Sequence, residues 1–319
     1  MKTGIIVVSN REVVDGPLKF GEQYNAISQD NLRVATAARS GDDWTIDLLP
    51  ESQENEKPGS EKLFEEMLSL TRSGGIVPQW VVFVHGFNTS FPDSLKHAET
   101  LRALYGVNVL LFSWPSNPGP DFLVKKLVEY QKARVNALRS GSAFDRLLEK
   151  LGRYVRLHVA PDCPVRFNLI TYSQGNYLLE SYIRLPIYGQ GETELFDNLV
   201  LCSADVDAKT HKEWVSSTSV KRKIYATINE NDKVLSMSNK VNPTRLGQTT
   251  KNLDAIGVVY MDFTDGEGVN DTHRMFDFSA HRNETIRLFF NDVLNSRSGE
   301  RIEGITYNDF TGAYEVDNR

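Results

Sequence analysis

Hydrophobic and polar positions alternate along the chain in a pattern of short strands and longer helices. Three β-like segments open the chain at residues 4–8, 32–38 and 44–49, and a polar, charged loop follows at 50–62. Beyond this loop, apolar runs typical of buried strands alternate with segments of helical periodicity. The expected strands are 80–84, 109–112, 165–170, 199–202, 223–228 and 258–261, and the expected helices are 64–70, 94–104, 122–138, 144–157, 176–183 and 284–294. This alternation predicts an α/β fold with a mostly parallel central sheet and helices on both faces.

The domain organisation follows from the same pattern. We expect a single domain over residues 1–295, in which residues 1–60 form a β-rich N-terminal extension packed on the rest. The connection from residue 206 to residue 222 is short, so no large lid domain is expected there. Residues 296–319 form a C-terminal tail that is expected to be a β-hairpin at a sheet edge, or a segment that binds a protein partner.

Composition narrows the possible functions. The chain has 319 residues, 40 % of them hydrophobic, which is enough for one large core. Its net charge is −6 and no dense stripe of Lys and Arg interleaves with aromatics, so a nucleic-acid partner is not expected. Cys163 and Cys202 are too few for a disulfide framework or a zinc site, and we expect no metal and no cofactor. No apolar run approaches the length of a transmembrane segment, which favours a cytoplasmic protein.

The pentapeptide Thr171-Tyr172-Ser173-Gln174-Gly175 carries the strongest chemical signal. It lies between an apolar strand and a helix, the context of a nucleophile elbow with Ser173 at its apex. Such elbows need small residues two positions before and after the serine, because strand and helix approach closely there. Gly175 meets this need, whereas Thr171 meets it poorly. Ser203 is another serine at a strand end, but no glycine and no helix follow it.

A serine nucleophile requires a base, and hydrolases built on this elbow follow the chain order Ser, acid, His. Three histidines follow Ser173. His211 lies among charged residues that indicate a solvated surface, and His281 opens the last helix. His273 lies in the loop between the last apolar strand and the last helix, where the base is expected. His273 is therefore the predicted base, with His281 as the main alternative.

The predicted acid is Asp232, in the turn 229–232 that directly follows the strand 223–228. The alternative interpretation of this residue is an ordinary turn cap, since Asp and Asn are common in turns. Asp205 is the second candidate for the acid, and its neighbour Asp207 and Glu230 are weaker ones.

An oxyanion hole needs two backbone N–H groups, one just after the nucleophile and one after an early strand. Gln174 supplies the first by its position. The strand 80–84 ends in His85-Gly86-Phe87, so the N–H of Phe87 is the expected second donor and Gly86 permits close backbone approach. We expect His85 to be a buried structural histidine bonded to nearby backbone.

These segments together resemble the α/β-hydrolase superfamily, and most closely a bacterial family of α/β hydrolases whose members mostly lack an assigned function. The resemblance covers roughly residues 4 to 295 in the family's order. It is carried by residues 7–11, 20–21, 84–88, 112–115, 169–176, 203–207, 231–235, 245–247 and 273–276. The resemblance implies Ser173 as nucleophile, Asp232 as acid and His273 as base, in agreement with the interpretation from the residues alone.

Two residues of the elbow depart from the family's pattern, which usually has a small residue where Thr171 stands and His where Tyr172 stands. Neither change removes a catalytic group, so both bear on rate and specificity. Tyr172 is therefore a candidate for contact with the substrate, together with Trp114 and Asn88. Trp114 opens a Pro-rich segment that is equally well explained as a rigid turn.

The leading hypothesis is a serine hydrolase that cleaves a small-molecule or lipid ester, thioesters included, through an acyl-enzyme on Ser173. The alternative is a catalytically silent scaffold with the same fold that binds a protein partner or an acyl ligand, a hypothesis motivated by Thr171 and the tail. A peptidase is a third possibility, since nothing in the sequence separates peptide from ester substrates.

Overall fold

The computed structural model describes residues 4–25, 31–50, 56–116, 123–277 and 282–317. By its internal contacts the chain falls into two compact units. The first comprises Met1–Phe83 and Phe87–Arg166, and the second comprises Val84–Gly86 and Phe167–Arg319.

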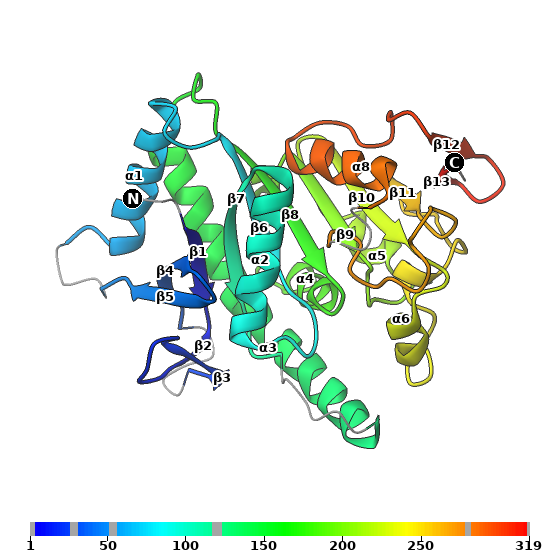
Figure 1. The fold of residues 1–319 in the computed structure, drawn as a ribbon, viewed down its shortest axis with the longest axis horizontal. Helices are drawn as coiled ribbons and strands as arrows, with labels where there is room; N and C mark the ends of the chain where they lie inside the picture. Colours follow the sequence, from blue (N-terminus) through cyan, green and yellow to red (C-terminus); the bar gives the residue numbers. More distant parts are fainter. Residues whose placement is uncertain (1–3, 26–30, 51–55, 117–122, 278–281, 318–319) are drawn as a thin grey trace. The chain divides into compact units, whose positions relative to one another are not determined.

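The first unit is built on five sheet strands in the order β6-β7-β1-β4-β5. β1 is parallel to β7 and antiparallel to β4, and β4 and β5 are antiparallel. In Figure 1, α2 crosses in front of β6 and β7 and α3 runs behind the strands. The elements are β1 (Ile5–Ser9), β2 (Arg11–Val13), β3 (Phe20–Tyr24), β4 (Arg33–Ser40), β5 (Asp43–Leu48), α1 (Gly59–Arg72), β6 (Gln79–Val84), α2 (Phe91–Tyr105), β7 (Asn108–Ser113) and α3 (Leu123–His158).

Local sequence explains these boundaries. Every residue of β7 is buried, as expected for a strand covered on both faces. Ser90 caps the start of α2 by accepting a hydrogen bond from the Asp93 N–H, and Gly106 ends the helix in the left-handed conformation with φ 62°.

The helix α3 differs from the expectation of two helices, at 122–138 and 144–157. It is one helix of 36 residues. The segment between the two expected helices, residues 139–143, holds no proline, and its small residues pack instead of breaking the helix. Ser140 is fully buried and accepts a hydrogen bond from Asn10 Nδ2 at 3.0 Å. The helix therefore continues through residues 139–143, the gap between the two expected helices.

The second unit has six strands in the order β8-β9-β10-β11-β13-β12. β8 is parallel to β9, β9 to β10, β10 to β11 and β11 to β13, whereas β12 pairs with β13 in an antiparallel manner at the edge. The mostly parallel α/β class predicted from the sequence is confirmed. The elements are β8 (Arg166–Tyr172), α4 (Gly175–Ile183), η1 (Gln190–Leu195), β9 (Asn198–Cys202), α5 (Lys212–Val215), β10 (Lys223–Ile228), α6 (Lys233–Ser238), η2 (Leu246–Gln248), β11 (Val258–Asp262), α8 (Glu284–Leu294), β12 (Ile305–Asn308) and β13 (Ala313–Val316).

Helix α8 buries its apolar face in the core of the second unit. Asn283 caps its start by accepting a hydrogen bond from the Ile286 N–H. The ring of Phe289 packs edge-on against Tyr225 and Phe263, with ring centroids 5.4 and 5.2 Å apart. Within the part of the chain that the structure describes, no helix is long and apolar enough to cross a lipid bilayer.

Candidate active site

Ser173 stands at a sharp turn between β8 and α4. Its backbone has φ 54°, the left-handed region that non-glycine residues rarely adopt. Two glycines permit the close packing around it. A Cβ on Gly86 would lie 2.7 Å from Ser173 Cβ, and a Cβ on Gly175 would lie 2.7 Å from the carbonyl oxygens of Val84 and His85. Only glycine fits both positions without a shift of the backbone.

Ser173, His273 and Asp232 form a continuous chain of hydrogen bonds within the second unit. Ser173 Oγ lies 2.9 Å from His273 Nε2, and His273 Nδ1 lies 2.6 Å from Asp232 Oδ2. Since a carboxylate only accepts, Nδ1 carries the proton and Nε2 is left to accept the Ser173 hydroxyl proton. Ser173 is 6 % exposed and the Asp232 side chain is fully buried.

The two carboxylate oxygens of Asp232 have different partners. Oδ1 accepts hydrogen bonds from the N–H groups of Val234 and Leu235, so it caps the start of α6. Oδ2 is directed to His273. The two interpretations of Asp232 from the sequence, turn cap and partner of the histidine, thus both describe this residue, one for each oxygen.

Two polar residues that the sequence analysis did not assign to the site hold the loop of His273. Ser203, which follows β9 with φ 46°, donates a hydrogen bond from its hydroxyl to the His273 carbonyl oxygen at 2.5 Å. Asn229, at the end of β10, donates from Nδ2 to the carbonyl oxygens of Asn270 and Thr272 at 3.1 and 2.8 Å. The one signal in the sequence for these two residues is their position directly after a strand, Ser203 after β9 and Asn229 after β10.

Asn176 is a third residue that the sequence analysis missed, and it stabilises the elbow itself. The buried Nδ2 group lies 3.0–3.2 Å from the carbonyl oxygens of Thr171, Ser173 and Cys202. Its Oδ1 accepts the hydroxyl of Thr171 at 2.7 Å. Thr171 is fully buried and its hydroxyl has a partner, so the turn accommodates this β-branched residue.

Tyr172 packs against the histidine. Its ring centroid lies 5.1 Å from that of His273 and 5.3 Å from that of Phe276, which it meets edge-on. Burial raises the pKa of the Tyr172 hydroxyl well above its usual value, so this group is neutral. The tyrosine therefore forms an apolar wall beside the imidazole.

The alternative acids have other partners. Asp205 Oδ1 accepts a hydrogen bond from the Ser238 hydroxyl at 2.7 Å and lies 3.9 Å from Nη1 of the buried Arg245. Glu230 is exposed and binds the N–H and hydroxyl of Thr250.

The alternative bases are His281 and His211. His281 lies outside the described residues. The prediction that His211 lies on a solvated surface is wrong, because its side chain is fully buried. Nδ1 lies 2.7 Å from the Ala208 carbonyl oxygen and Nε2 lies 2.6 Å from the Tyr260 hydroxyl. Burial lowers the pKa of His211, which favours the neutral ring.

The remaining predicted residues lie just after the ends of β6, β7 and β8. His85 is buried in the second unit, with Nδ1 3.0 Å from the Gly86 carbonyl oxygen. Gln174 directly follows Ser173 and is the N-cap residue of α4, where the helix dipole is positive. Phe87 belongs to the first unit, where its ring meets Tyr130 edge-on at 5.5 Å. Asn88 has φ 54° and Trp114 is fully buried.

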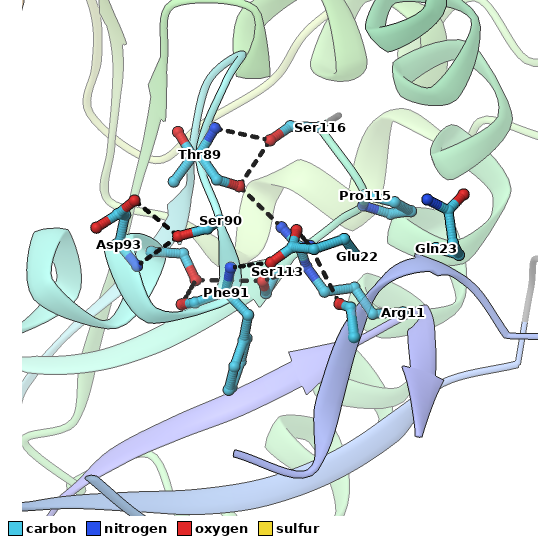
Figure 2. A network of polar contacts seen from close by, with 12 residues as sticks. Arg11, Glu22, Gln23, Thr89, Ser90, Phe91, Asp93, Ser113, Pro115 and Ser116 are labelled. Carbon is cyan, nitrogen blue, oxygen red and sulfur yellow. Dashed lines mark hydrogen bonds and ion pairs between the residues drawn. The ribbon is translucent and has the colours of Figure 1, made fainter. Parts of the chain in front are cut away.

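Arg11 fixes the segment that follows Phe87 and Asn88 (Figure 2). The fully buried guanidinium donates from Nη2 to the Thr89 carbonyl oxygen and from Nε to Ser113 Oγ, both at 3.0 Å. It also pairs with Glu22, whose other oxygen accepts the Phe91 N–H at 2.9 Å. Burial lowers the pKa of Arg11, and the Glu22 carboxylate opposes that effect. An ion pair between the buried Arg11 of β2 and the partly exposed Glu22 of β3 therefore holds the start of α2.

Three side chains of the first unit could together hold a metal ion: Glu61 and Glu65 on α1 and His158 at the end of α3. Their own contacts account for their proximity. His158 Nε2 lies 2.8 Å from Glu61 and Nδ1 lies 3.3 Å from Glu65, which also pairs with Lys57 at 2.7 Å. The described contacts thus give each of the three a partner within the protein.

The comparison with protein families agrees with this architecture. A family model described as "Alpha/beta hydrolase of unknown function (DUF900)" matches residues 61–270. No curated protein and no solved structure matches the chain. The matched range spans more than half of the sequence and includes the strand–elbow–helix segment and the turn of Asp232. The chain therefore belongs to this family of alpha/beta hydrolases.

Proposed function

We propose that this protein is a serine hydrolase that cleaves a carboxylic ester, thioesters and lipid esters included, through an acyl-enzyme on Ser173. The observation that carries the proposal is the pair of distances from His273, 2.9 Å to Ser173 Oγ and 2.6 Å to Asp232 Oδ2. Nucleophile, base and orienting acid within hydrogen-bond reach are the arrangement that activates a serine.

The proposed reaction has two halves. Ser173 Oγ attacks the acyl carbonyl carbon while His273 Nε2 takes the hydroxyl proton, and Asp232 stabilises the imidazolium that forms. The imidazolium then gives this proton to the departing alcohol or thiol, which leaves the acyl group on Ser173. In the second half, water gives a proton to Nε2 and attacks the acyl carbon, and the acid is released as Ser173 recovers its proton. From their sequence positions, the N–H groups of Gln174 and Phe87 are the proposed oxyanion donors.

Labelling of the purified protein with a fluorophosphonate probe tests the proposal. We expect labelling of the wild type, loss of labelling in Ser173→Ala, and a rate at least about a thousandfold lower in His273→Ala. Ser69→Ala is the matched control, because Ser69 is an exposed serine on α1. Turnover of p-nitrophenyl esters of increasing chain length, beside a p-nitroanilide, would then separate ester from peptide substrates.

Labelling that survives in Ser173→Ala would refute the assignment of the nucleophile. A folded wild-type protein that takes no label would favour the alternative of a catalytically silent scaffold. We also propose a cytoplasmic location, which cell fractionation tests. A protein partner for residues 296–319 is a further proposal, which a pull-down with and without that tail tests.

A further inference from the structure

Helix α3 is strongly basic in a chain that is acidic. It carries nine Lys and Arg against three Asp and Glu, whereas the whole chain has a net charge of −6. Such a local reversal of charge marks a surface that can attract an anionic partner although the protein as a whole repels one.

The first half of α3 also presents apolar side chains to solvent. Val128, Val135 and Leu138 are 53 %, 47 % and 53 % exposed, and Leu127 is exposed as well. The opposite side of the same turns is buried, with Ala133 and Ala137 fully covered. With 3.6 residues per turn, Val128 and Val135 lie nearly opposite these alanines. We call the four exposed residues the α3 stripe.

Basic residues border the α3 stripe on both sides. Lys132 and Arg139 lie along one border and are exposed, and Arg134 lies along the other. Lys132 pairs with Glu129 at 2.9 Å, and Glu129 is the sole acidic residue in the first half of the helix. Leu127, Val128, Gln131, Lys132 and Val135 line a shallow hollow on this face. In Figure 1 the first turns of α3 extend beyond the strands of the first unit.

We propose that the α3 stripe binds the surface of an anionic lipid bilayer. A helix with an apolar face bordered by Lys and Arg lies in the bilayer interface, with its apolar side chains among the acyl chains and its cations near anionic headgroups. A second copy of the chain fits less well, because a symmetric contact would bring two basic borders together. Nucleic acid fits less well, because its phosphates offer nothing for four aliphatic side chains to contact.

Flotation with vesicles tests this proposal, using phosphatidylcholine vesicles with and without phosphatidylserine. The full chain should float with the anionic vesicles at low salt, and added salt should weaken the binding. Lys132→Gln with Arg139→Gln should weaken it about 25-fold, since each cation near an anionic surface contributes about fivefold. Val128→Ser with Val135→Ser should weaken it about tenfold.

The matched control is Ile256→Ser with Lys96→Gln, an exposed apolar residue and an exposed cation outside α3, and it should bind as the wild type does. Vesicle binding needs no turnover, so its failure is distinct from a failure of the proposed hydrolase activity. Three results would overturn the proposal: no flotation of folded wild-type protein, binding of an RNA or DNA duplex in place of vesicles, or a dimer in solution that Val128→Ser with Val135→Ser dissociates.

Discussion

The elbow depends on one buried asparagine, and this dependence can be measured. Asn176 lies against three carbonyl oxygens through Nδ2 and accepts the Thr171 hydroxyl through Oδ1. Asn176→Ala removes these contacts and leaves the Thr171 hydroxyl buried without its acceptor. The two protons of Nδ2 give two net hydrogen bonds of about 1 kcal/mol each, and the orphaned Thr171 hydroxyl costs about 1–3 kcal/mol, so the free energy of unfolding should fall by about 3–5 kcal/mol.

Thr171→Val is the complementary change. It keeps the shape of the side chain but removes the hydroxyl, which leaves Asn176 Oδ1 without this donor and should cost about 1–2 kcal/mol. In the double variant neither orphan exists, because each change removes the partner of the other. The loss of stability in the double variant should therefore be about 1–2 kcal/mol smaller than the sum of the two single losses.

Thermal melts of the wild type, both single variants and the double variant measure this coupling. With an unfolding entropy of about 2.1 cal/mol/K per residue, 319 residues give roughly 1.5 °C per kcal/mol, so Asn176→Ala should lower Tm by about 5–7 °C. The rate of fluorophosphonate labelling should fall about tenfold or more, because Asn176 binds the carbonyl of the strained Ser173. Asn291→Ala, a partly exposed asparagine on α8, is the matched control. Strictly additive losses, or an unchanged labelling rate, would refute this reasoning.

Three further changes separate other parts of the structure. Asp232→Asn keeps the cap on α6 through its amide oxygen but loses the carboxylate at His273. Labelling should therefore slow about a thousandfold or more with little change in Tm. A large fall in Tm beside the slower labelling would contradict the division between the two oxygens. His211→Gln tests how stability depends on pH. The pKa of His211 in the folded protein lies below the unfolded value of 6.5, so the unfolded chain binds the proton first as pH falls. The free energy of unfolding of the wild type should therefore decrease as pH drops below about 6.5. Urea midpoints at about pH 7.5 and about pH 5.5 should differ less in this variant, and an equal difference would count against it. Arg11→Met removes a buried cation whose partner Glu22 is one-third exposed. The free energy of unfolding, measured in thermal melts, should fall by about 2–3 kcal/mol. An unchanged value would show that the pair gives no net stability.

The sequence predicts which strand ends meet, because parallel strands place their carboxyl ends at one edge of a sheet. β8, β10 and β11 were expected as strands, so the residues that follow them could be expected to lie close together. Ser173, Asp232 and His273 follow these three strands. Periodicity and chain order thus suffice to predict that these three residues lie together, as their hydrogen bonds show.

The same reasoning fails where burial depends on a partner far along the chain. His211 stands among charged neighbours and reads as a surface residue, yet it is buried against the Tyr260 hydroxyl, 49 residues away. Ser203 and Asn229 bind backbone carbonyls of the His273 loop, and a carbonyl has no signature in a sequence. Ser140 in α3 is similar, because its partner Asn10 lies 130 residues away in the sequence.

Two successive strands of the second unit end in strained serines, and one side chain connects them. Ser173 and Ser203 have φ of 54° and 46°, and both contact His273, one through the imidazole and the other through the backbone carbonyl. Asn176 reaches the carbonyl of Ser173 and the carbonyl of Cys202, the residue before Ser203. Strain of this kind, about 1–3 kcal/mol at each residue, persists only where the surroundings fix the backbone. The geometry of the elbow therefore rests on a residue just beyond the pentapeptide that identifies it, and the same residue connects the turn of the nucleophile to the turn that holds the histidine.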